Sequence, residues 1–274
     1  MATVKHEPLP YPQLRISDNW GQTGGTPELV SKVFQQIQGS DIQGKIDSLN
    51  NFIFSCSEKG ACPKMSIALS NILVLDAISS ILHEYEAQGA GQLFENFMAM
   101  LVLGTKEGGN GGITDFWMDE PGKGSTSLKL LKKGGRVEGS VEYLNRVLNS
   151  PELGNKCTYI VAYKGESLNK LAFYKAEVTS INDVDISAAN PNRFTVPTKS
   201  LKKIASLGGL SPKVLRKSAA NVLKTIDSSI SEVYENLSIL SNSLTLYFLE
   251  DEVSEGHKAK QSSNRVKEII YNKI

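Results

Sequence analysis

Apolar residues in the first hundred positions recur every three or four residues, the period of a helix that packs one face against a core. Thr26, Pro27 and Glu28 form a typical helix start, with a capping hydroxyl, a proline in the first turn and an acid near the N-terminal dipole. A break is expected at "AQGAGQ". The pattern predicts four helices in this part of the chain: 28–38, 40–54, 65–86 and 92–104.

The pattern changes after "GTKEGGNGG" to short runs rich in Ile, Val, Tyr and Phe, each bounded by Gly, Pro or polar clusters. One helical segment, 137–150, interrupts these runs, with Val141, Leu144 and Leu148 at helical spacing. The runs predict four strands: 113–117, 125–131, 158–164 and 170–181. The order helix, strand, strand, helix, strand, strand indicates an α+β or α/β fold with a mixed sheet.

From about residue 199 the pattern is helical again, and Ser211-Pro212 is a second capped start. The apolar stripe from Leu215 to Leu240 predicts an amphipathic helix of about thirty residues. Residues 244–249 fit a continuation of that helix or a strand equally well, and a short helix is expected at the end of the chain. The stripe either packs against the domain or, in helix 212–249, binds a partner or a second copy.

These segments suggest three regions. Residues 1–25 are rich in Pro and Gly and are expected to form an extended arm. Residues 26–195 are expected to hold a helical bundle that leads into an α/β core, and residues 196–274 a basic segment followed by a helical region. The three cysteines are interpreted as ordinary free thiols, since no ready set of zinc ligands accompanies them.

The formal net charge is only +1, so overall charge favours no particular partner. Charge is nevertheless segregated, because 121–136 and 196–224 contain basic residues and no acid, whereas 225–256 contains acids and no Lys or Arg. The basic segments would suit a nucleic-acid backbone. Alternatively, basic and acidic segments neutralise each other within the chain or between copies. The candidate nucleic-acid contacts are Lys123, Lys132, Lys133, Lys202, Lys203, Arg216 and Lys217.

Residues 111–135, "GGITDFWMDEPGKGSTSLKLLKKGG", contain the candidate chemistry. Metal-dependent phosphodiester cleavage needs a carboxylate that holds Mg²⁺, a second ligand and a cation that orients the attacking water. Ser127 and Lys129 are two apart on a predicted strand and should share a face. A hairpin would bring Asp115 beside them, and Glu95 on the preceding helix could add a carboxylate.

The same stretch contains "PGKGST", which fails the phosphate-loop pattern because Gly124 rather than Ser or Thr follows Lys123. A hairpin turn is the better interpretation.

This arrangement resembles the PD-(D/E)XK nuclease superfamily, in which a helix with a Glu precedes a hairpin carrying Asp on one strand and (D/E)-x-K on the next, followed by a helix and another strand. The resemblance covers about residues 90–175 and implies a restriction-endonuclease-like core. It implies Asp115 and Glu95 as Mg²⁺ ligands, Lys129 as the water-orienting cation and Ser127 as a weak ligand. The implied function is Mg²⁺-dependent DNA cleavage or DNA binding.

The sequence departs from this pattern at Ser127, which replaces the second acid of the family by a neutral hydroxyl. The alternative is therefore a protein that keeps the fold without the chemistry. In its many Ser and Asn residues, its Gly-rich segment before the strands and its long helix, the chain also loosely resembles uncharacterised proteins of tailed phages. This resemblance implies a virion structural or assembly component. The first twenty residues lack the apolar segment of a secretory signal, so we expect the chain in the cytoplasm of a host cell or in a virion.

Overall fold

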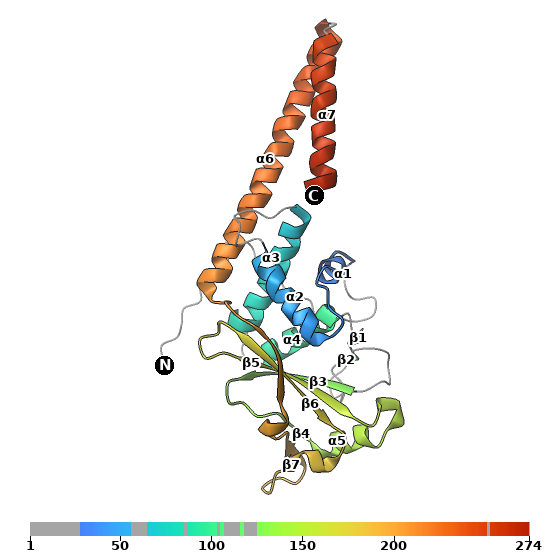
Figure 1. Cartoon of the computed structure of the whole chain (residues 1–274), viewed down its shortest axis with the longest axis vertical. Helices are drawn as coiled ribbons and strands as arrows, with labels where there is room; N and C mark the ends of the chain where they lie inside the picture. The colour runs from blue at the N-terminus through green and yellow to red at the C-terminus, as the bar shows by residue number, and fades with distance from the viewer. Residues whose placement is uncertain are drawn as a thin grey trace. The chain divides into compact units, whose positions relative to one another are not determined.

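The computed structural model describes residues 28–55, 65–84, 87–102, 105–106, 116–117, 125–250 and 253–273. These residues fall into two compact units (Figure 1). The first contains 28–51 and 76–215, and the second contains 52–75 and 216–273. The fold is α+β, as the sequence predicted, with a mixed sheet, N-terminal helices and two long C-terminal helices.

The described residues of the N-terminal part are mainly helical. Its elements are α1 (Glu28–Gln35), α2 (Ile42–Phe54), α3 (Met65–Ser79), the π-helical turn η1 (Ser80–Glu84) and α4 (Ala87–Val102). The stripe predicted for α2 is fully buried at Ile46, Leu49 and Ile53. Asp41 caps this helix, because its carboxylate accepts the backbone N–H of Gly44 at 2.7 Å. The expected break at "AQGAGQ" is wrong: these residues form the first turns of α4, where the helix preference of Ala and Gln outweighs the two glycines.

The main sheet contains six strands in the order β1-β2-β3-β5-β6-β9. Their bounds are β1 (Thr105–Lys106), β2 (Phe116–Trp117), β3 (Ser125–Lys132), β5 (Cys157–Lys164), β6 (Leu171–Val178) and β9 (Lys202–Leu207). Strands β3 and β5 are parallel and all other neighbours are antiparallel. The connection from β3 to β5 contains α5 (Val141–Leu148), the helix predicted between these strands. All four predicted strands are present in the sheet, β2 as a two-residue strand.

Three strand regions were not predicted. One is β1, which lies just beyond the helix predicted over 92–104. The expectation of helix from about residue 199 is wrong, because β9 pairs with β6 there before α6 begins. A second, three-stranded sheet has the order β4-β8-β7, with β4 (Glu138–Ser140), β7 (Asp185–Ile186) and β8 (Arg193–Thr195). Gly139 is required in β4, since an added Cβ would lie 2.5 Å from the ring of Phe194.

Helices cover both faces of the main sheet. On one face, α4 packs through Phe94, whose ring lies 6.3 Å from that of Phe173 on β6. On the other face, α5 packs against the odd-numbered residues of β5 and the second sheet, through Leu144 and Val147. The buried core on the α5 face consists of Val137, Leu144, Val147, Cys157, Tyr159, Val161, Ala176, Val178, Val184, Phe194 and Val196.

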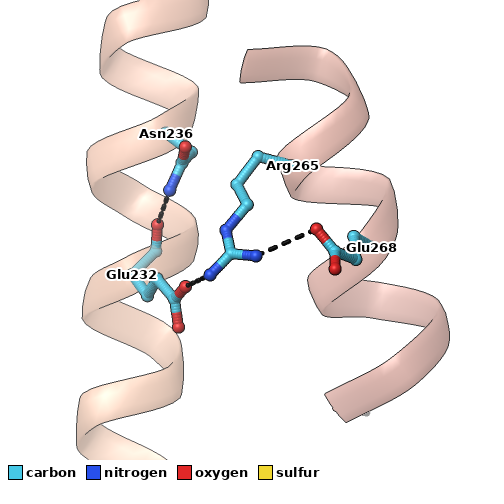
Figure 2. A network of polar contacts seen from close by, with 4 residues as sticks. All are labelled: Glu232, Asn236, Arg265 and Glu268. Carbon is cyan, nitrogen blue, oxygen red and sulfur yellow. Dashed lines mark hydrogen bonds and ion pairs between the residues drawn. The ribbon is translucent and has the colours of Figure 1, made fainter. Parts of the chain in front are cut away.

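The second unit contains a helical hairpin formed by α6 (Pro212–Glu250) and α7 (Val253–Lys273). Residues 244–249 are helical, and the terminal helix is longer than expected. Arg265 on α7 joins the two helices, because it donates to the Glu232 carboxylate at 2.8 Å and to Glu268 at 2.9 Å (Figure 2). Near the start of α6, Val222 packs against Ala68 of α3. No helix in the described ranges has the length and hydropathy of a bilayer-spanning segment.

Candidate functional site

Ser127 and Lys129 lie on the same face of β3, as period-2 alternation requires. In the parallel pairing with β5, Ser127 is opposite Tyr159 and Lys129 is opposite Val161. Both partners belong to the core on the α5 face. Ser127 is only 7% exposed, whereas Lys129 is half-buried. A hydroxyl and an ammonium group are therefore placed on one face of β3, next to strand residues of the α5-face core.

The hairpin expected before β3 is present, since β2 runs antiparallel to β3 with Phe116 opposite Thr126. Asp115, the principal expected metal ligand, lies outside the described residues, as does Lys123 in the expected turn. The predicted closeness of Asp115 to Lys129 stays a prediction. Among the described residues, no three His, Cys, Asp or Glu side chains lie close enough together to hold a metal ion. The expected ligand set includes Asp115, which is not one of the described residues.

Glu95 is on α4 between two buried residues, Phe94 and Asn96, and is itself half-buried. The contact between Phe94 and Phe173 shows that α4 packs on the face of the sheet opposite to Ser127 and Lys129, because Phe173 pairs with Ala162, an even-numbered residue of β5. The structure therefore unites Ser127 and Lys129 on one face and places Glu95 on a helix that covers the other.

Lys132 and Lys164 form a basic pair at the carboxyl ends of β3 and β5. They are direct register partners in the parallel pairing. Burial, and then the charge of Lys132, lower the pKa of Lys164. The next residue, Lys133, is exposed and forms an ion pair with Glu166 at 2.6 Å. This end of the sheet thus holds two adjacent amines that an anion could bridge.

Sequence reasoning missed Lys164. The available signal was that two of the predicted strands, 125–131 and 158–164, are apolar runs that end at or next to lysine. Parallel pairing then brings the two lysines together, and only the register decides that they are direct neighbours.

The basic run 196–224 is divided between the two units. Lys202 and Lys203 are exposed on the edge strand β9 in the first unit. Arg216 and Lys217 are on α6 in the second unit, where Arg216 is half-buried and Lys217 exposed. Lys202 is opposite Lys175, which forms an ion pair with Glu177 at 2.7 Å. The hydrogen bond from Lys175, with its charge, lowers the pKa of Glu177.

A hollow on the α4 face is lined by the first turn of α2 together with Lys45 and Lys175. Both amines are already engaged, since Lys45 donates to the carbonyl of Ile37 at 2.7 Å and Lys175 pairs with Glu177. Burial lowers the pKa of Lys45. The Asp41 carboxylate lines the same hollow, which makes it a poor site for an anion.

Neither a protein-family model, nor a curated protein, nor a solved structure matches this chain.

Proposed function

We propose that this chain is a DNA-cleaving or DNA-binding protein of the PD-(D/E)XK type that uses Mg²⁺. The observation that supports the proposal is the order and pairing of elements around β3. Helix α4 with Glu95 precedes an antiparallel β2–β3 pair, and α5 then leads to β5, which lies parallel to β3. This is the order of elements that the sequence resemblance implies.

In this proposal Asp115 is the main Mg²⁺ ligand and Lys129 orients the attacking water. The proposal requires Asp115 to lie opposite Ser127, one residue beyond the observed pair of Phe116 with Thr126. Ser127 then offers a neutral oxygen to the metal. Glu95 must reach the metal past the edge of the sheet, because its helix covers the opposite face.

Phosphate groups of the nucleic acid would contact the basic residues around this core. Lys132 and Lys164 are the best-placed pair, because a bound phosphate would relieve the repulsion between two amines in direct register. Lys133, Lys202 and Lys203 are exposed and would add contacts in the first unit. Lys123, Arg216 and Lys217 complete the set proposed from the sequence.

A second candidate is a catalytically inactive protein of the same fold that acts as a virion structural or assembly component. Ser127 favours this alternative, since a neutral, nearly buried hydroxyl is a much weaker Mg²⁺ ligand than a carboxylate. The two candidates differ in one measurable property, metal-dependent cleavage.

The test uses supercoiled plasmid incubated with the full chain in Mg²⁺ or Mn²⁺. If the chain is a nuclease, the wild type nicks the plasmid, Asp115→Asn and Lys129→Ala abolish nicking, and Ser127→Glu keeps or raises it. Lys170→Ala is the matched control, because Lys170 is an exposed lysine outside the proposed site. No cleavage by the wild type or by Ser127→Glu in either metal would favour the structural component.

A further inference from the structure

One side of α6 presents a row of large apolar side chains to solvent. The row consists of Ile230, Tyr234, Leu237, Leu244 and Phe248, with Ser241 between them. Successive positions differ by four, three, four, three and four residues, so all six lie on one stripe of the helix. Tyr234 is 71% exposed and Phe248 75% exposed. Contiguous apolar patches of this kind on a protein surface mark interaction sites.

The neighbouring helix leaves most of this row exposed, although Leu244 lines a hollow together with residues of α7. Helix α7 turns Glu255, Ala259 and Ser262 inward, and these three are buried. On α6 the buried residue at this level is Ser243, which lies on a different side of the helix from the row. Helix α7 therefore packs against one side of α6, and the more apolar side that carries the row stays largely exposed to solvent.

We propose that this row is the contact between two copies of the chain, with α6 of one copy packed antiparallel against α6 of the other. The spacing of the row is the same in both directions. In an antiparallel pair centred on residue 239, Ile230 lies opposite Phe248 of the other copy. Tyr234 then lies opposite Leu244, and Leu237 opposite the small Ser241. A two-fold contact needs such a self-complementary surface.

The distribution of acidic residues along α6 favours the antiparallel arrangement over a parallel one. Residues 236–249 contain no charged side chain, whereas Glu232 and Glu235 lie near the start of the row. A parallel pair would bring these acids of the two copies together. An antiparallel pair places them opposite uncharged residues, and Glu232 already bonds Arg265 of its own copy. The acids Glu250, Asp251 and Glu252 follow the row, so an anionic lipid surface is a poor occupant.

The exposed area suits a protein contact. A fully buried aromatic side chain hides about 150–250 Å², so the exposed parts of Tyr234 and Phe248 amount to roughly 200–350 Å² per copy. A stable interface of standard size buries about 800 Å² per partner. The rings of Tyr234 and Phe248 thus supply a substantial share of the area that such an interface buries, and the remaining apolar residues of the row add to it.

The test is sedimentation velocity of the full chain over a wide concentration range. We expect the wild type to dimerise and the double variant Leu237→Glu, Phe248→Glu to dissociate, with a dimer constant at least about tenfold weaker, because each buried carboxylate lacks a partner. The matched control is Ile239→Glu. Ile239 and Leu237 are both 42% exposed, but they lie about 200° apart around the helix, so the control should still dimerise.

Circular dichroism checks that each variant is folded. If the charged variant loses helix, the milder pair Tyr234→Ser, Phe248→Ser replaces it, with the same expected loss of dimer. A wild type that stays monomeric at every concentration overturns the proposal, whether or not it binds lipid vesicles. So does a dimer that the row variants leave intact and Ile239→Glu disrupts.

Orientation is tested by disulfide trapping in a background with Cys56→Ser and Cys62→Ser. Two differently tagged variants, Ile230→Cys and Phe248→Cys, are mixed under mild oxidation. The antiparallel arrangement gives the mixed disulfide, whereas like-with-like disulfides would indicate a parallel pair and overturn the proposal. This readout is independent of nuclease activity.

Discussion

Lys132 and Lys164 lie directly opposite each other at the carboxyl ends of two parallel strands. Like charges in direct cross-strand register disfavour the folded state. Neither amine is in an ion pair with any described residue, while the adjacent Lys133 is paired with Glu166. The folded protein therefore contains a charge repulsion between Lys132 and Lys164, and a bound anion would reduce it.

We expect Lys164→Gln to stabilise the protein at neutral pH by about 0.2–1 kcal/mol, since it removes this repulsion. The gain should shrink at high salt, which screens the charges. Burial and Lys132 lower the pKa of Lys164 from its ordinary 10.5, so the unfolded chain binds more protons in the window below that value. Wild-type stability should then rise with pH across that window. Urea unfolding at several pH values measures both effects, and Lys170→Gln should show neither.

A carboxylate introduced at Ser127 tests whether a metal can bind there. Ser127 is nearly buried beside core residues, so Ser127→Glu should lower the free energy of unfolding by about 1–3 kcal/mol without metal. If Mg²⁺ binds the folded site, millimolar Mg²⁺ should restore part of that loss. Ser127→Gln has the same shape without the charge and should gain nothing from Mg²⁺. Equal responses of the two variants to Mg²⁺ would count against a metal site.

Two pairs of basic residues test the proposed DNA binding separately in each unit. Lys202→Gln, Lys203→Gln changes the edge strand of the first unit, and Arg216→Gln, Lys217→Gln changes α6 in the second. Each lost phosphate contact reduces the slope of log K against log salt by about 0.9. We expect the β9 pair to reduce the slope by up to about two contacts, because both its lysines are exposed. The α6 pair should have a smaller effect, since Arg216 is half-buried. Fluorescence anisotropy at several salt concentrations measures the slopes, and an unchanged slope for both pairs would exclude these residues as phosphate contacts.

Gly139 should not tolerate a side chain. A Cβ there would overlap the ring of Phe194, so Gly139→Ala should destabilise the protein by about 1–3 kcal/mol through overpacking. Gly208→Ala is the matched control, because nothing lies within 4 Å of the added carbon, and its effect should stay within about 0.5 kcal/mol. Thermal unfolding of the two variants compares them directly.

The elements that the sequence predicted are those in which apolar residues recur regularly over a whole segment or a capping residue marks the start. The stripe of α2, the strand β3 and the capped start of α6 each follow from local residue patterns. Strand β9 was missed because it begins with Lys202 and Lys203, and only Ala205 and Leu207 are buried. The face on which α4 packs could not be predicted, because it depends on contacts such as Phe94 with Phe173 between distant segments. For the same reason the pairing of Lys132 with Lys164 required the register of the folded sheet.

The parallel pairing of β3 with β5 has a consequence for how the chain folds. Strands β5 and β6 are joined by a short loop and can pair locally, whereas Ser125 meets Cys157 only after the intervening α5 segment has folded back. Contacts between residues far apart in sequence form slowly, because the loop must close before the pairing stabilises it. During synthesis the edge of β3 that pairs with β5 therefore stays unpaired until β5 has been made, and an unpaired strand edge is prone to aggregation.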